Sequence, residues 1–327
     1  MTPTLGERVL AGDPRAIARA ISLIEDEDPA SADVVRSIFA RTGRAYLIGV
    51  TGPPGAGKST LVDRLVAAFR SGGPGARAFQ ASDDARPAVG VIAVDPTSPF
   101  SGGAVLGDRL RMQAHAQDPG VFIRSMATRG HLGGLARATG DAALVLDAAG
   151  VETIVIETVG VGQDEVDIIR TADVAIVTLV PGTGDEVQAL KAGIMEIADI
   201  FVVNKADREG ADRLVSAVEA NLALHSYASG EWRPPIVKTA ATTGAGVPEL
   251  VGAIAAFREH SRGVQNSRRK ARSEYRLREL VSQRFMSHLE REVLAAGELA
   301  AIVDRISARD LDPYTAANEL LRRALTS

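Results

Sequence analysis

Residues 52–59 read Gly52-Pro53-Pro54-Gly55-Ala56-Gly57-Lys58-Ser59, and they lie between two stretches of different hydrophobic pattern. Residues 45–50 (AYLIGV) form a short apolar run typical of a buried strand, whereas residues 61–69 (LVDRLVAAF) carry apolar side chains at helical spacing. The eight residues fit the pattern GxxxxGK followed by Ser or Thr, which binds phosphate when a strand precedes it and a helix follows it. This context predicts a phosphate-binding loop on an α/β sheet rather than a chance Gly/Pro turn.

The residue types of this loop suit a nucleotide polyphosphate with Mg²⁺. Glycines allow backbone N–H groups to surround a phosphate, and the following helix presents its positive N-terminal end. Lys58 adds a point charge for the β and γ phosphates, and Ser59 offers a hydroxyl ligand to Mg²⁺. The expected nucleotide contacts in this segment are Gly52, Pro54, Gly55, Ala56, Gly57, Lys58, Ser59 and Thr60.

Six further apolar runs follow the loop and alternate with helical stretches. They cover residues 89–94, 121–124, 153–157, 174–180, 200–204 and 235–238. This alternation predicts an α/β fold with a doubly wound, mostly parallel sheet. Residues 71–88 are rich in Gly and Pro and read as a surface loop between the first helix and the second strand.

The two ends of the chain have a purely helical pattern. Residues 5–40 predict two or three short helices, broken at Gly12-Asp13-Pro14 and at Asp28-Pro29. After residue 260 the strand-like runs stop, and apolar residues recur every fourth position from Leu277 to Val293, which predicts one long helix before two shorter ones. We therefore expect an N-terminal helical segment (1–42), a nucleotide-binding domain (43–260) and a C-terminal helical unit (261–327).

Composition limits the function classes. The 327 residues are 46% hydrophobic and 24% charged, as in folded globular chains, and the formal charge of -4 gives no overall attraction to nucleic acid or anionic lipid. The absence of cysteine excludes thiolate metal sites and cysteine nucleophiles. The apolar runs are shorter than the ~20 residues of a membrane span, and the N-terminus lacks the apolar core of a signal peptide. We expect a cytoplasmic protein with neither a nucleic-acid partner nor a membrane segment.

Asn204-Lys205-Ala206-Asp207 follows the apolar run of residues 200–203 and forms an NKxD element, which indicates the base. A carboxylate at Asp207 accepts hydrogen bonds from N1 and N2 of guanine, whereas adenine offers no such pair of donors. Leaving a buried carboxylate unpaired costs ~1–3 kcal/mol or more, which favours guanine by about tenfold to a few hundredfold. A helix-starting turn is the alternative interpretation of these four residues alone. Thr239 and Ala240, after the last strand-like run, are expected over guanine O6, although a simple strand-end turn fits them almost as well.

Two acidic residues at strand ends complete the expected metal side. Asp95 closes the second apolar run and Glu157 closes the fourth, where Mg²⁺ ligands of open α/β sheets are found. Each could instead cap a helix. Gly160, three residues after Glu157, is placed to donate its backbone N–H to the γ phosphate, so the segment from Val161 to Asp164 is the expected second switch.

Several blocks together resemble a known family, the MeaB-type GTPases associated with methylmalonyl-CoA mutase, also described as ArgK-type transport ATPases, within the SIMIBI class of P-loop proteins. The blocks are TGPPGAGKST (51–60), AVDPTSPFSGGAVLGDRLRM (93–112), ATRGHLGGLAR (127–137), ETVGVGQDE (157–165), PGTGDEVQALKAGIMEIAD (181–199) and VVNKAD (202–207). The resemblance implies a P-loop fold with helical extensions at both ends, the C-terminal one serving dimerisation. It loosens after residue 245, and segment 71–88 is longer than usual in this family.

The resemblance also implies further roles. Asp95 and the residues after it would form the first switch, with Asp108 as a second acid near Mg²⁺ and the γ phosphate. Residues 181–191 would form a third switch, in which Asp185 and Lys191 respond to the nucleotide and contact the mutase. The residues themselves only indicate a polar turn that opens a helix. The implied function is GTP hydrolysis to GDP and phosphate by a homodimeric chaperone that gates cofactor loading from an adenosyltransferase to a cobalamin-dependent mutase.

Other functions remain open at this point. A phosphotransferase of an amino-acid transport system is one alternative, and a metal-insertion GTPase is another, although the five histidines form no HxH or HxxxH pair. No residue stands out as a general base; Gln163 and Asp108 are candidates, so slow hydrolysis that a partner stimulates is expected. The basic cluster from Arg268 to Arg272 reads as a solvated or partner-binding helix face rather than an RNA or phospholipid site.

Overall fold

The structure is a computed structural model that describes residues 2–72, 79, 88–95, 113–115, 117–127, 134–158, 171–182 and 194–326. Its internal contacts divide the chain into two units, Met1–Gln265 and Asn266–Ser327. No helix in these described ranges is long and apolar enough to cross a membrane.

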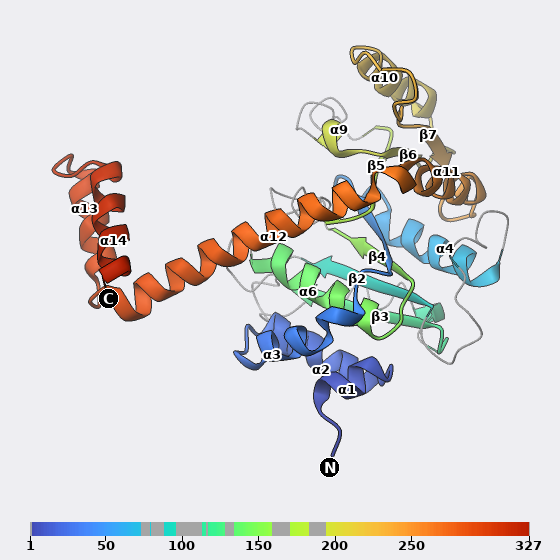
Figure 1. The fold of residues 1–327 in the computed structure, drawn as a ribbon. Coiled ribbons are helices and arrows are strands. Elements are labelled where there is room, and N and C mark those ends of the chain that lie inside the picture. Colours follow the sequence, from blue (N-terminus) through green and yellow to red (C-terminus); the bar gives the residue numbers. More distant parts are fainter. Residues whose placement is uncertain are drawn as a thin grey trace. The chain divides into compact units, whose positions relative to one another are not determined.

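A parallel sheet forms the centre of the first unit (Figure 1). Each strand coincides with one of the apolar runs, and every pairing between neighbours is parallel. The order across the sheet is β3-β2-β4-β1-β5-β6-β7, so β1, which precedes the phosphate loop, lies in the middle. The strands are β1 (Tyr46–Thr51), β2 (Val89–Asp95), β3 (Val121–Ala127), β4 (Thr153–Glu157), β5 (Val174–Leu179), β6 (Ile200–Asn204) and β7 (Ile236–Thr239).

Helices cover both faces of this sheet. On one face α4 and α11 bury the side chains that alternate along the strands, such as Ile48 of β1 and Ile176 of β5. On the other face α6 and α10 pack against the intervening residues, such as Ile154 and Val177. The α-helices in the described part of this unit are α1 (Leu5–Leu10), α2 (Pro14–Glu25), α3 (Ala30–Ile38), α4 (Lys58–Ser71), α6 (Gly134–Ala148), α9 (Ile194–Ile197), α10 (Ala211–Leu222) and α11 (Val247–His260).

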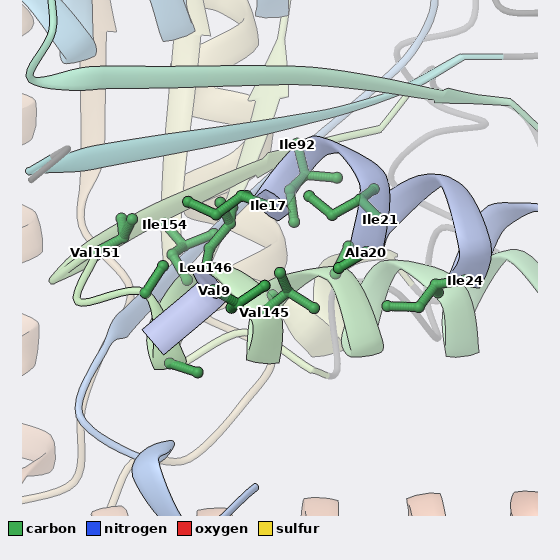
Figure 2. Close-up of a cluster of buried hydrophobic side chains, with 14 of the residues drawn as sticks. Val9, Ile17, Ala20, Ile21, Ile24, Ile92, Val145, Leu146, Val151 and Ile154 are labelled. Atoms are coloured by element: carbon green, nitrogen blue, oxygen red, sulfur yellow. The ribbon is translucent and has the colours of Figure 1, made fainter. Parts of the chain in front are cut away.

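The three N-terminal helices share a core with α6. Their buried side chains, including Ile17 and Ile21, interleave with Val145 and Leu146 of α6 (Figure 2). The breaks expected from sequence delimit them, since Asp13 caps α2 at Pro14 and Pro29 immediately precedes α3. A charged contact adds to the apolar one, because Arg124 of edge strand β3 donates to Glu25 of α2 at 2.8 Å.

The described part of the second unit consists of helices and the short turns between them. Helix α12 (Gln265–His288) is followed by a π-helical turn at Leu289–Val293, and then by α13 (Glu298–Ser307) and α14 (Pro313–Thr326). The long helix that the apolar residues from Leu277 to Val293 predicted is therefore not one continuous α-helix. It changes to i→i+5 pairing at its end, where the N–H of Leu294 bonds to the carbonyl of Leu289.

The predicted fold class is confirmed: helices flank a parallel sheet on both faces, and further helices precede and follow it. The expected surface loop 71–88 lies mostly outside the described residues. Phe79 within it is an exception, because its ring is buried and packs on Phe69 and Tyr46 with centroid distances of 4.9 and 5.9 Å. This part of the segment therefore belongs to the core, which its Gly- and Pro-rich neighbours did not indicate.

Candidate nucleotide-binding site

The predicted site residues follow strands that end at one edge of the sheet. Because the strands are parallel, their carboxyl ends lie together, and β1, β2, β4, β6 and β7 end at Thr51, Asp95, Glu157, Asn204 and Thr239. The pairing places Glu157 beside Val50 of β1 and Ala93 of β2. Ligands of open α/β sheets bind at this edge, next to the strand where the order reverses.

The phosphate loop joins β1 to α4 and folds around two of its own carbonyl groups. The Lys58 ammonium donates to the carbonyl oxygens of Gly52 and Pro53 at 2.7 and 3.1 Å, so its charge lies over the loop. A side chain on Gly52 is impossible without rearrangement, since a Cβ there would lie 2.0 Å from the carbonyl oxygen of Thr178. The loop thus presents backbone and ammonium donors at the start of α4, which fits a polyphosphate.

The metal side of the site contains two oxygen groups in contact. The Ser59 hydroxyl donates to Oε1 of Glu157 at 2.5 Å, and both side chains are buried. Behind them, Thr158 ties β4 to β1, because its hydroxyl donates to the Thr51 hydroxyl at 2.9 Å and its N–H to the carbonyl of Val50 at 3.0 Å. Hydroxyl and carboxylate oxygens are the ligand types that Mg²⁺ prefers, so this pair fits the ion.

Asn204 connects the base side to the phosphate loop. Its amide donates to the Ala56 carbonyl at 2.8 Å, while its oxygen accepts from the Thr239 hydroxyl and the Ala241 N–H at 3.0 and 3.1 Å. The side chain is buried, and its partners are the phosphate loop, the last residue of β7 and the loop that follows it. One amide therefore holds the phosphate loop and the loop after β7 in a fixed relation.

Lys205 and Asp207 of the same element differ in their surroundings. Lys205 adopts the left-handed backbone conformation at φ 55°, and its ammonium donates to the Gly55 carbonyl at 2.7 Å. Strained backbone of this kind concentrates at functional sites. The energetic argument for guanine assumed that the Asp207 carboxylate is buried. The structure shows this side chain exposed, so the protein by itself does not bury it.

The structure brings together the loop residues 52–59, Glu157, Asn204, Lys205 and Thr239. Thr60 lies next to Ser59 in α4, and Ala240 pairs with Ala245 in an isolated bridge. Asp95 is described only as the end of β2. The other predicted residues lie outside the described residues: Asp108, Gly160, the segment from Val161 to Asp164 with Gln163, Asp185 and Lys191.

Sequence reasoning missed two contributors to this geometry. Thr158 follows Glu157 directly, and its position next to an acidic strand end was the only signal that the sequence offered. Arg64, in the middle of α4, donates to the carbonyls of Ala241 and Thr242, and nothing in its helical pattern indicated that contact. Within the described ranges there is no group of three or more acidic or histidine side chains arranged to hold a metal ion.

A parallel sheet flanked by helices, with a phosphate loop after its central strand and an asparagine that joins this loop to the base side, defines a P-loop nucleotide-binding protein. Within that class, the chain belongs to the family described as methylmalonyl Co-A mutase-associated GTPase MeaB, whose model matches residues 17–293. The family bears out the resemblance seen in the sequence and identifies the chain as a GTPase that binds guanine nucleotide.

Known proteins match nearly the whole chain. A protein of Pyrococcus abyssi that is assigned as a GTPase is 49% identical over 99% of this chain and 97% of its own length. The GTPase ArgK of Escherichia coli is 33% identical over 86% of this chain and 84% of its own. Among solved structures, that of a protein called LAO/AO transport system kinase superposes with a TM-score of 0.69 at 26% identity, covering 97% of this chain and 95% of that one.

Proposed function

We propose that the chain hydrolyses GTP to GDP and phosphate with Mg²⁺, and that it does so slowly unless a partner assists. The observation that carries the proposal is the Asn204 network, because one buried amide couples the phosphate loop to the loop beside the expected base. Such a coupling is needed when one site must recognise both the base and the phosphates of a nucleotide.

Each residue near the loop has a proposed task. Lys58 exchanges its contacts with the carbonyls of Gly52 and Pro53 for the β and γ phosphates, and the backbone N–H groups of residues 55–60 surround them. Ser59 and Glu157, with Asp95 at the neighbouring strand end, would hold Mg²⁺, which neutralises charge on the phosphates when bound. Asp108 and Gly160 are proposed at the γ phosphate.

The base side accounts for the proposed preference for guanine. Asp207 accepts from N1 and N2 of the base, Asn204 and Lys205 hold the base site against the phosphate loop, and Thr239 and Ala240 face O6. Replacement Asp207→Asn should shift the preference from guanine toward xanthine nucleotides, since an amide pairs with the O2 atom of xanthine. Unchanged affinity for GDP in this variant, measured by titration, would remove Asp207 from the base site.

The proposed cellular role is that of a chaperone for an adenosylcobalamin-dependent methylmalonyl-CoA mutase. The support is membership of a family described as associated with that enzyme. In this role the nucleotide state gates loading of the cofactor from its adenosyltransferase and protects or reactivates the mutase, with Lys191 and Asp185 relaying the state. Lys191→Ala should leave GTP binding intact and abolish stimulation of hydrolysis by the mutase; normal stimulation would contradict the third switch.

We further propose a homodimer formed through the second unit. Its described helices expose apolar side chains that a solitary helical unit would be expected to bury. They are Leu277, Val281, Met286, Val303, Leu321 and Leu325. Sedimentation should give twice the chain mass, and Val281→Glu combined with Leu325→Glu should give the mass of one chain. A monomeric wild-type protein would contradict the proposal.

Phosphotransfer to a protein of a transport system is the second candidate. It is favoured by the solved structure called LAO/AO transport system kinase, which covers nearly all of this chain. The two candidates differ in where the γ phosphate goes. Labelled phosphate released into solution supports hydrolysis, and label retained on a protein supports the kinase.

A further inference from the structure

Arg64 connects the helix of the phosphate loop to the loop after β7. It lies six residues after Lys58 on α4, about 9 Å along the helix axis. Its Nε donates to the Ala241 carbonyl at 3.0 Å, and its Nη2 donates to the Thr242 carbonyl at 2.8 Å. Both donors carry part of the guanidinium charge, which makes such hydrogen bonds stronger than neutral ones.

The two contacts fix the orientation of the peptide groups that they bind. Ala241 is held from both sides, since its N–H donates to Asn204 at 3.1 Å while its carbonyl accepts from Arg64. In a planar trans peptide the C=O and the following N–H point in opposite directions. Arg64 therefore turns the Ala241 carbonyl toward α4 and the N–H of Thr242 away from it. The N–H groups of Ala240 and Ala241 already donate to the Ala245 carbonyl and to Asn204. The Thr242 N–H is therefore the backbone donor whose direction Arg64 sets.

We propose that Arg64 is a positioning residue for base selection, which it performs by fixing the peptide between Ala241 and Thr242 so that the Thr242 N–H faces guanine O6. The inference rests on the proposed binding of guanine nucleotide and deepens it. One helix then serves both ends of the ligand, because α4 carries Lys58 and Ser59 at its start and Arg64 two turns later.

Arg70 provides a matched control on the same helix. It is a partly exposed arginine in the last turn of α4, and it also makes two hydrogen bonds, to the carboxylate of Asp118 at 2.8 and 2.9 Å. Its partner precedes β3 and is not part of the loop after β7. Arg64→Ala and Arg70→Ala therefore remove the same side chain and a similar pair of hydrogen bonds, and only the first releases the loop.

The experiment titrates both variants and the wild-type chain with GDP, 6-thio-GDP and IDP. Sulfur is a weak acceptor, so 6-thio-GDP reports on the contact at O6, whereas IDP lacks the 2-amino group and reports on Asp207. In Arg64→Ala we expect GDP affinity to fall roughly 3- to 10-fold, the range of one or two partly exposed hydrogen bonds. In Arg64→Ala the preference for GDP over 6-thio-GDP should shrink, whereas the preference for GDP over IDP should persist. Arg70→Ala should keep both preferences at the wild-type level.

Two further readouts separate positioning from general damage. KM for GTP should rise in Arg64→Ala while kcat is unchanged, and Arg64→Lys, which retains one charged donor, should restore part of the O6 preference. Equal losses for GDP and 6-thio-GDP, or wild-type affinities for both, would overturn the inference. If the wild-type chain binds GDP and Arg64→Ala keeps the same preference for GDP over 6-thio-GDP, this inference alone is overturned. If the wild-type chain binds no GDP, the proposed function is overturned as well.

Discussion

At the scale of single residues, the site depends on a few buried polar groups with several partners each. Asn204 makes three hydrogen bonds to two loops, and Ser59 contacts Glu157 across the boundary between α4 and β4. Removing such a group leaves its buried partners unsatisfied, which costs ~1–3 kcal/mol for each of them. Substitution of Asn204 or Ser59 is therefore expected to disturb the contacts between the loops of the site.

Two glycines of the phosphate loop provide a matched test of its backbone. Gly52→Ala should lower the free energy of unfolding by at least ~3 kcal/mol, because φ is 140° and the new Cβ would lie 2.0 Å from the Thr178 carbonyl oxygen. Gly55→Ala should cost only ~1–2 kcal/mol, since φ is 76° and no atom lies within 4 Å of the new Cβ. Urea denaturation without nucleotide measures both, and equal effects would contradict the close approach at Gly52.

Asn204, Lys58 and Arg64 show which residues of the candidate site can be predicted from the sequence and which cannot. Asn204 and Lys58 were identifiable because their motifs follow strand ends, and a motif in that context fixes a place in the fold. Arg64 was not identifiable, since its role depends on which loop is opposite α4, and that proximity joins residues 177 and 178 positions apart. Local patterns carry no information about such contacts.

At the scale of secondary-structure elements, the N-terminal helices are part of the core of the first unit. Ile21 of α2 is fully buried against α6, whereas Phe39, at the end of the same helical segment, is 59% exposed. Ile21→Ala should therefore reduce the free energy of unfolding by ~2–5 kcal/mol, and Phe39→Ala should change it by less than ~0.5 kcal/mol. Thermal denaturation of both variants checks this; a small effect of Ile21→Ala would mean that the helices dock only loosely.

In the second unit, an ion pair joins α13 to α14. Glu298 at the start of α13 accepts from Arg323 of α14, which lowers the pKa of Glu298 to about 2, and the Ala295 N–H contributes further. Because the pKa of Glu298 is lower than its ordinary value of 4.5, the contact stabilises the helix pair fully at pH values above 4.5. This stabilisation is lost as the pH falls toward 2, where Glu298 becomes protonated.

The pH dependence can be followed directly at the carboxyl group. In a carbon-13 NMR titration of the whole chain, Glu298 should remain charged at pH values between its ordinary pKa and about 2, where exposed glutamates become protonated. Arg323→Gln should return the Glu298 midpoint toward 4.5. An ordinary midpoint in the unmodified chain would show that the pair does not persist in solution.

The elements themselves were largely predictable. All seven apolar runs became strands, because buried parallel strands require continuous apolar sequence. Pro14 and Pro29 mark the start of helices as expected. The end of α12 was not predictable, since a repeat of apolar residues every fourth position does not distinguish an α-helix from a helix with a terminal π turn. The strand order also had to come from the structure.

At the scale of the whole molecule, the described site residues all belong to the first unit, and the second unit contributes exposed apolar helices. This division suits a protein in which one part binds nucleotide and another binds a second copy. The match to the MeaB family runs from residue 17 to residue 293, so it covers most of the first unit and the beginning of the second. The proposed association with a mutase is therefore a property to test on the full chain.

The most direct test of the central claim is steady-state release of phosphate from GTP and from ATP by the purified chain with Mg²⁺, with Lys58→Ala as the inactive control. We expect slow release from GTP, little from ATP, and none above background in the variant, because Lys58 carries the charge over the phosphate loop and Asp207 is the proposed contact to guanine. Equal release from GTP and ATP, or release that persists in Lys58→Ala, would contradict the assignment of this site.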